Sequence, residues 1–141
     1  MRNKRVGLIL AGGTGKRLFP LTSVINKSLL PIYSKPTIFY SLSILMMAGI
    51  RKIGIISTPR DIDSYKNLFS DGFHLGLDIE YFVQPKPEGI AQSFLVTKDF
   101  IKGRKVALIL GDNIIYGYDL TKILKKANST KRGAVVFGYQ V

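Results

Sequence analysis

A segment near the N-terminus combines glycines with cations in a way that suits a phosphate group. An apolar run typical of a buried strand, Val6 to Ala11, leads directly into Gly12-Gly13-Thr14-Gly15-Lys16-Arg17, here called the glycine loop. Glycine lets backbone N–H groups approach a phosphate closely and adopt positive φ, while cations neutralise the phosphate oxygens. Lys27 adds a further cation, and the first sixty residues contain ten Lys and Arg but no Asp or Glu. We therefore expect this part of the chain to hold a polyanion.

Two common phosphate-binding motifs do not account for the loop. A P-loop requires glycine, four residues and then Gly-Lys-Ser/Thr, but Leu10 stands at the first glycine position and Arg17 at the hydroxyl position. A dinucleotide fingerprint requires Gly-x-Gly-x-x-Gly, but Gly13 and Gly15 are followed by Leu18. Taken alone, the loop is also compatible with a tight turn whose cations are solvated.

The length and composition of the chain exclude several classes of protein. A chain of 141 residues has the length of one domain, and its 46% hydrophobic and 21% charged residues are typical of a globular protein. The absence of cysteine excludes disulfides and thiolate metal sites and suggests a cytoplasmic location. No apolar run approaches the ~20 residues of a membrane span, and the short run after the basic N-terminus does not fit a signal peptide. We therefore expect no membrane partner.

The net charge of +12 leaves a nucleic-acid partner to be considered. Several lysines gather in the segment 119–129, which also has the pattern of an ordinary amphipathic helix with Asp119 as its N-cap. The expected apolar stripe of this helix consists of Leu120, Ile123, Leu124 and Ala127. The lysines then form its solvated face, and no zinc-knuckle or aromatic RNA-binding pattern supports the alternative. A phosphorylated small molecule is the favoured partner, and nucleic acid is disfavoured.

Strand-like and helix-like segments alternate along the chain. The expected strands are 5–11, 52–57, 78–84, 105–110 and 133–139, and the expected helices are 36–48, 61–70, 89–100 and 119–129. Alternation of this kind predicts a largely parallel sheet with helices on both faces, and continuous apolar strands fit a sheet buried on both sides. We therefore predict an α/β fold with a Rossmann-like, doubly wound sheet.

Three polar loops follow three of these strands. In doubly wound sheets, ligands bind beyond the carboxyl ends of the strands, where the strand order reverses. The glycine loop follows the first strand, 84–89 follows the third and 111–113 follows the fourth. Asp112 is then either a Mg²⁺ ligand, since Mg²⁺ takes one or two carboxylates plus phosphate oxygens, or part of an Asx turn. Opposite a cationic glycine loop, the metal role is favoured.

Gln84 and Gly89 are weaker candidates for a ligand site. The amide of Gln84 can donate and accept at once, which suits the imide edge of thymine or uracil, although a glutamine at a strand end is usually solvated. Gly89 either lets the backbone approach a base or simply begins the next helix. Neither residue is diagnostic by itself.

Taken together, the motifs resemble one family. The sequences Gly-Gly-x-Gly-x-Arg-Leu, Lys-x-Leu-Leu-Pro, Val-Gln-Pro-x-Pro-x-Gly and Leu-Gly-Asp-Asn-Ile-x-Tyr-Gly occur in this order. They resemble glucose-1-phosphate thymidylyltransferases, a branch of the sugar nucleotidyltransferases (pyrophosphorylases), over essentially all of Val6 to Val141. The resemblance implies a GT-A-like fold and thymidylyl transfer from dTTP to glucose 1-phosphate, with Mg²⁺ as cofactor. The product, dTDP-glucose, would serve deoxysugar synthesis, including rhamnose and lipopolysaccharide O-antigen.

The resemblance also implies roles for nine residues. It assigns triphosphate contacts to Gly12, Gly13, Thr14 and Gly15, the departing pyrophosphate to Arg17, the α-phosphate region to Lys27, Mg²⁺ to Asp112, and thymine to Gln84 and Gly89. Arg17 and Lys27 would be the catalytic pair, because phosphoryl transfer of this kind depends mainly on positioning and charge neutralisation. His74, the sole histidine, has no matching role and is expected at the surface.

Two departures from the family pattern affect these expectations. Ser28 stands where close relatives commonly have glutamine, which is expected to cost a contact near the nucleotide. The chain also ends at Val141, where members of the family are only half complete, so we expect residues 1–141 to be one nucleotide-binding half-domain. We expect little or no turnover by this chain alone and an exposed sheet edge, while the homo-oligomer typical of the full-length family is left open. The alternative is a nucleotide-binding module without turnover.

Overall fold

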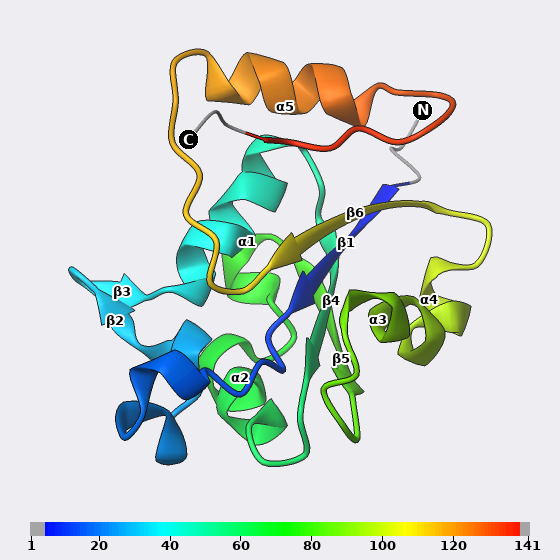
Figure 1. The fold of residues 1–141 in the computed structure, drawn as a ribbon. Coiled ribbons are helices and arrows are strands. Elements are labelled where there is room, and N and C mark those ends of the chain that lie inside the picture. The colour runs from blue at the N-terminus through cyan, green and yellow to red at the C-terminus, as the bar shows by residue number, and fades with distance from the viewer. Residues whose placement is uncertain (1–4, 139–141) are drawn as a thin grey trace.

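The centre of the protein is a four-stranded, fully parallel sheet (Figure 1). The computed structural model describes residues 5–138. The strands of this sheet are β1 (Arg5–Leu10), β4 (Lys52–Ser57), β5 (Asp78–Val83) and β6 (Lys105–Leu110), in the order β5-β4-β1-β6. All four lie where the sequence predicts strands. β1 pairs with both β4 and β6, so that Leu8 lies opposite Gly54 and Leu108, and the strand order reverses at β1.

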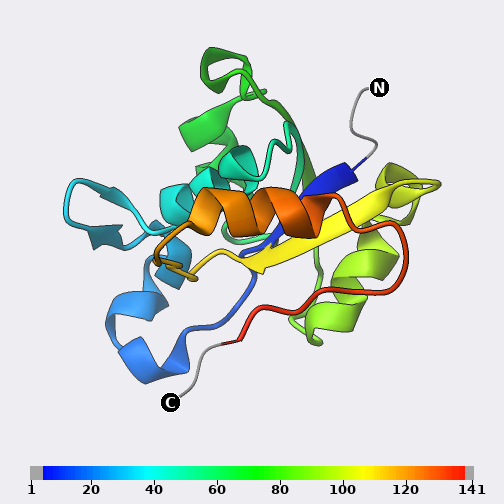
Figure 2. The ribbon, with the colours of Figure 1, turned by 90° about the horizontal axis from the view of Figure 1, so that it is seen from above.

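Helices cover both faces of the sheet. The α-helices are α1 (Ile38–Met47), α2 (Ile62–Phe69), α3 (Ile90–Val96), α4 (Lys98–Ile101) and α5 (Leu120–Asn128). Figures 1 and 2 show α1 and α2 on one face and α3 and α4 on the other, with α5 lying against α1. This arrangement confirms the predicted doubly wound α/β class. Among residues 5–138, no helix has the length and apolar character needed to cross a bilayer.

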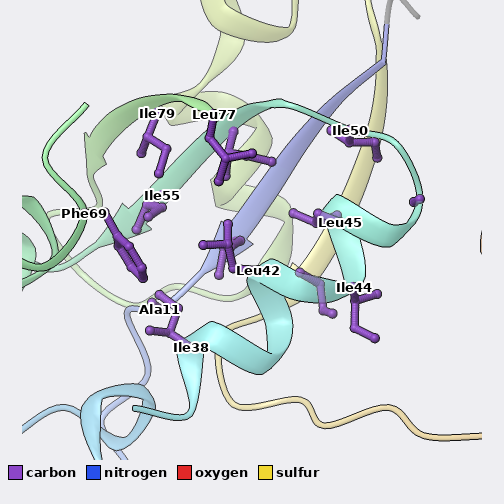
Figure 3. Packing of buried hydrophobic residues seen from close by; sticks show 14 of the residues in the cluster. Ala11, Ile38, Leu42, Ile44, Leu45, Ile50, Ile55, Phe69, Leu77 and Ile79 are labelled. Atoms are coloured by element: carbon purple, nitrogen blue, oxygen red, sulfur yellow. The ribbon is translucent and has the colours of Figure 1, made fainter. Parts of the chain in front are cut away.

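Two apolar layers hold the helices against the sheet. The larger layer joins β1, β4 and β5 to α1 and α2, and Figure 3 shows Leu42, Ile55 and Phe69 within it. The smaller layer lies on the opposite face, where Leu8 packs with Phe100. Parallel strands that are buried on both faces consist of nearly continuous apolar residues, and β1 and β4 have this pattern, whereas β5 includes Asp78 and Glu80 and is partly exposed.

A short hairpin and four 3-10 helices interrupt the alternating pattern. The hairpin consists of β2 (Pro31–Ile32) and β3 (Lys35–Pro36), and the 3-10 helices are η1 (Lys16–Leu18), η2 (Leu21–Ser23), η3 (Lys27–Leu29) and η4 (Phe73–Leu75). The expectation that Pro36 begins the first helix is wrong, because Pro36 pairs with Pro31 in the hairpin. The Tyr40 hydroxyl donates a hydrogen bond to the carbonyl of Ile32 (2.8 Å) and so ties the hairpin to α1.

The helix expected over 89–100 is divided into α3 and α4. Thr97 separates them with φ −106° and ψ 15°, outside the regular helical region. Its hydroxyl donates to the carbonyl of Ser93 (2.7 Å), a side-chain contact of the kind that competes with regular helical bonding. The expectation of one continuous helix is therefore wrong at Thr97.

The start and the apolar stripe of α5 differ from the prediction. Asp119 occupies the N-cap position, but its backbone is left-handed (φ 56°) and its side chain makes no capping hydrogen bond. Leu124 is buried, whereas Ile123 is 47% exposed, so the stripe facing α1 is narrower than expected. The lysines Lys122 and Lys125 are exposed, in agreement with a solvated face.

The strand expected over 133–139 does not form within residues 133–138, and Tyr139 lies outside the described residues. An apolar pocket of about 570 Å³ lies between this segment and β6, with walls that include Val106, Leu108 and Val135. A strand needs a neighbouring strand for its backbone N–H and C=O groups, and this segment forms no ladder with β6. In the described part of the chain, β6 is therefore an open edge of the sheet.

Candidate active site

A pocket of about 350 Å³ opens at the carboxyl ends of β1 and β6. Its walls include six residues singled out from the sequence, namely Gly13, Thr14, Gly15, Arg17, Lys27 and Asp112. The glycine loop follows β1, Lys27 begins η3 and Asp112 follows β6. The pocket therefore lies where the strand order reverses, which is where open α/β sheets bind their ligands.

Lys27 and Asp112 form an ion pair at this pocket. The Lys27 Nζ atom lies 2.7 Å from Asp112 Oδ2, and the two side chains are 46% and 30% exposed. Ion pairs with this much exposure contribute only about 0–1 kcal/mol to stability. The ammonium group can therefore move to an anionic ligand at a small cost in folding free energy, which leaves the carboxylate available to a cation.

The pocket has a marked excess of positive charge. Lys16, Arg17 and Lys27 all line it and all have exposed side chains. Asp112 is the only carboxylate among the described residues that line the pocket. A ligand with several negative charges is favoured in such a place.

Two glycines of the loop leave no room for a side chain. A Cβ atom on Gly15 would lie 2.7 Å from Thr22 Cγ2, and the Gly15 backbone is left-handed (φ 59°). A Cβ atom on Gly12 would lie 2.9 Å from Gln84 Oε1. At Gly13, in contrast, a Cβ atom would meet open space. The packing of the loop thus requires glycine at position 15, whereas a side chain at position 12 would have to displace the amide of Gln84.

Gly15→Ala should lower the free energy of unfolding by about 1–3 kcal/mol, because it combines a left-handed backbone with overpacking against Thr22. Gly13→Ala is the matched control in the same loop and should change that free energy by less than about 0.5 kcal/mol. Urea denaturation of both variants measures the difference. Equal stability of Gly15→Ala and Gly13→Ala would show that the loop does not have this conformation.

Gln84 is a buried residue that is fixed by side-chain hydrogen bonds. Only 1% of Gln84 is exposed, so the alternative of a solvated glutamine is wrong. Its Nε2 donates to the carbonyl of Gly89 (3.3 Å) and to Oε1 of Gln92. Gln92 in turn donates to Glu88 (2.8 Å). Gln84 and Gly89 do not line the pocket, but the close approach of Gln84 to Gly12 links their segment to the glycine loop.

A buried polar network beneath the glycine loop was not predicted from the sequence. Its centre is a hydrogen bond of 2.9 Å from Asn26 Nδ2 to Asp61 Oδ2, between residues that are only 2% and 6% exposed. Burial acts to raise the pKa of the Asp61 carboxyl, but hydrogen bonds from Arg60 and Asn26 outweigh it and hold that pKa below its usual value. The only sequence signals were an asparagine next to Lys27 and an aspartate at the start of a predicted helix.

Two further expectations concern Ser28 and His74. Ser28 is 4% exposed and forms part of the pocket wall. Its hydroxyl oxygen lies 2.8 Å from the place that a Cβ atom on Gly111 would occupy, so the small side chain packs against that glycine. The loss of a nucleotide contact at Ser28 stays a prediction. His74 is exposed in η4, as expected.

Comparison with known proteins identifies the family to which the chain belongs. The profile of the family described as nucleotidyl transferase matches residues 6–141. The chain belongs to the nucleotidyl transferase family. Glucose-1-phosphate thymidylyltransferases from Xanthomonas campestris pv. campestris and Neisseria meningitidis are 50% and 52% identical to it, over 98% and 96% of the chain. The match covers 47% of each relative, so the chain spans about half the length of the curated relatives it matches.

Solved structures of the same family share the fold. A Bacillus anthracis chain described as a glucose-1-phosphate thymidylyltransferase, in complex with sucrose, matches with a TM-score of 0.79 and 35% identity over 88% of this chain and 50% of that chain. A UDP-glucose pyrophosphorylase in complex with UDP-glucose matches with a TM-score of 0.73 and 25% identity over 89% of this chain and 52% of that chain. These matches confirm the nucleotidyltransferase fold that the motifs imply.

One carboxylate, that of Asp112, lines the pocket among the described residues. Among residues 5–138, no group of three or more Asp, Glu or His side chains is arranged to hold a metal. Mg²⁺ usually takes one or two carboxylates and completes its coordination with phosphate oxygens and water. Asp112 therefore fits a Mg²⁺ ion that arrives with a nucleotide better than a metal held by protein ligands alone.

Proposed function

We propose that the pocket formed by the glycine loop, Lys27 and Asp112 binds dTTP with Mg²⁺. The chain would then supply the nucleotide half of a glucose-1-phosphate thymidylyltransferase. One observation carries this proposal, namely that three cations, a glycine turn and a single carboxylate meet at the point where the strand order reverses. The choice of dTTP and glucose 1-phosphate rests on the names of relatives about half identical to this chain.

In the proposed reaction, a phosphate oxygen of glucose 1-phosphate attacks the α-phosphorus of dTTP. A new P–O bond forms, and the bond to the departing pyrophosphate breaks. The attacking oxygen is already anionic, so no side chain has to remove a proton. Catalysis then depends on holding two anions in line and on neutralising their charge.

We assign a separate part of this task to each group of pocket residues. We assign the glycine loop to the triphosphate, Arg17 to the pyrophosphate that leaves and Lys27 to the α-phosphate region. Lys27 would reach the ligand by leaving Asp112, whose carboxylate would hold Mg²⁺. When bound, Mg²⁺ supplies additional neutralisation of phosphate charge.

Gln84 and Gly89 are assigned to thymine. The Nε2 group of Gln84 already donates to Gly89 and Gln92. The Oε1 atom of Gln84 is the acceptor of the same amide, and we assign to it a hydrogen bond from the N3–H group of thymine. The same arrangement would accept uracil, so this contact selects the imide edge and not the methyl group.

Other features that the family resemblance implies stay predictions for this chain. They include a site for the sugar phosphate, a homo-oligomeric state, a cytoplasmic location and a role in deoxysugar, rhamnose or O-antigen synthesis. None of these follows from the pocket described above.

Asp112→Asn should remove the Mg²⁺ dependence of dTTP binding while leaving the fold intact. The substitution removes an exposed ion pair and the one carboxylate that lines the pocket among residues 5–138, so the stability should change by no more than about 1 kcal/mol. Calorimetric titration of dTTP with Mg²⁺ and with EDTA should give different affinities for the wild type and similar affinities for Asp112→Asn. If the variant keeps the full Mg²⁺ dependence, Asp112 is a turn residue and not a metal ligand.

The proposal as a whole is tested by titrating dTTP and a short DNA duplex at low and moderate salt. Saturable 1:1 binding of dTTP with a modest salt dependence supports the proposal. Steep salt dependence with DNA and no heat from dTTP would instead favour a nucleic-acid partner that uses the net charge of +12.

A further inference from the structure

The buried carboxylate of Asp61 lies beneath the glycine loop and outside the walls of the phosphate pocket. It accepts hydrogen bonds from three side chains, Asn26 Nδ2 (2.9 Å), Thr58 Oγ1 (3.2 Å) and Arg60 Nε (2.7 Å). Arg60 adds a second bond from Nη2 (3.0 Å) and so binds the carboxylate through two nitrogens. A buried carboxylate with this many donors is held rigidly in one orientation.

One route leads from Asp61 through Asn26 to both the glycine loop and Lys27. Asn26 Nδ2 donates to the carbonyl of Ala11 (3.0 Å), the residue directly before the loop, as well as to Asp61. Asn26 Oδ1 accepts from the backbone N–H of Ser28 (3.0 Å), the residue directly after Lys27. A single amide, oriented by Asp61, thus joins the start of the loop to the turn that carries Lys27.

A second route leads from Asp61 through Arg60 to Gly15 within the loop. Arg60 Nη1 donates to the carbonyl of Thr22 (3.3 Å). The Thr22 hydroxyl donates to the carbonyl of Gly15 (2.9 Å), which also accepts from the backbone N–H of Leu18. The two routes therefore reach Ala11 and Gly15, which lie on either side of the central glycines.

We propose that Asp61 is a positioning residue that pre-organises the phosphate pocket by holding the glycine loop, at Ala11 and at Gly15, and the Lys27 turn in one arrangement. This inference rests on the proposed function for its effect on dTTP. Its effect on the loop itself does not depend on any ligand. A loop that is already ordered loses less entropy when it binds a phosphate, so binding is tighter.

The test compares Asp61→Asn with Asp63→Asn. Both variants replace a carboxylate with an amide in the same part of the chain, but Asp63 is an exposed residue paired only with Lys66 among the described residues. In Asp61→Asn, the NH₂ group of the new amide would face N–H donors of Asn26 or Arg60. Two donors cannot form a hydrogen bond with each other, so the network would loosen. We expect Asp61→Asn to weaken dTTP binding by about ten-fold and Asp63→Asn to leave it unchanged.

Hydrogen exchange of the free protein gives a readout that requires no nucleotide. Peptides covering residues 11–30 should exchange faster in Asp61→Asn than in the wild type, while those covering β4 and β5 should keep their protection. Ile50→Val, a core substitution outside both routes, controls for general loss of stability and should leave exchange in 11–30 and dTTP affinity unchanged.

The outcomes separate this inference from the proposed function. Faster exchange in 11–30 confined to Asp61→Asn, together with weaker dTTP binding, supports both. Unchanged exchange in 11–30 overturns the positioning role, whatever the nucleotide affinity. If the wild type binds no dTTP, the proposed function fails, and the exchange measurement alone still decides whether Asp61 orders the loop.

Discussion

Lys27→Ala should weaken binding of dTTP with Mg²⁺ by about 10- to 100-fold, as expected for the loss of a charge-assisted hydrogen bond to phosphate. The substitution also leaves the Asp112 carboxylate without its partner at 2.7 Å. Without Mg²⁺, this unpaired carboxylate repels phosphate, so in EDTA the loss should be larger than for Arg17→Ala, which is expected to weaken binding by about ten-fold. Isothermal titration calorimetry measures both affinities.

Two further variants separate a local contact from a general effect of charge. In Lys27→Ala/Asp112→Asn the repelling carboxylate is gone, so without Mg²⁺ this double variant should bind dTTP better than Lys27→Ala does. Lys125→Ala removes an exposed lysine of α5 and changes the net charge by the same amount. It should keep the wild-type affinity. An equal loss in Lys125→Ala and Lys27→Ala would assign binding to overall charge and remove Lys27 from the site.

The 141-residue chain by itself should release pyrophosphate from dTTP and glucose 1-phosphate no faster than the uncatalysed background. The acceptor phosphate carries about two negative charges and must be held in line beside a triphosphate, which requires additional cations and a shaped pocket. Among residues 5–138, no second carboxylate joins Asp112 at the pocket, and the chain spans about half the length of its relatives. A coupled assay for pyrophosphate measures the rate.

The control for this assay is a full-length relative such as the Xanthomonas campestris thymidylyltransferase, measured under the same conditions. Adding a polypeptide equivalent to the second half of that relative should raise the rate if the two pieces complete one site. Robust turnover by the 141-residue chain, lost in Lys27→Ala, would contradict the need for an acceptor half.

The strands of the sheet show what composition can and cannot predict. The runs 52–57 and 105–110 are apolar on both faces, which fits only a buried strand or helix, and their short length favours strands. The segment 133–138 has a similar apolar character, yet it forms no strand. Its conformation depends on whether a neighbouring edge supplies hydrogen bonds, and composition carries no such information.

The site residues also divide into those that the sequence could place and those that it could not. The glycine loop and Asp112 could be placed together from topology, since the carboxyl ends of parallel strands share one edge of the sheet. Asp61 could not, because an aspartate before a helix already has an ordinary explanation as a cap. Its partner Asn26 is 35 positions away, and only the folded chain brings the two together.

The location of the bound nucleotide is the central claim, and amide chemical-shift mapping tests it most directly. Addition of dTTP with Mg²⁺ to isotopically labelled protein should shift the amide signals of the glycine loop, Lys27 and Asp112 in a saturable 1:1 manner. Signals of residues beside the apolar pocket at β6, such as Leu108 and Val135, should stay in place. Shifts centred on that β6 pocket, or no shifts with dTTP in large excess, would contradict the assignment of the nucleotide site.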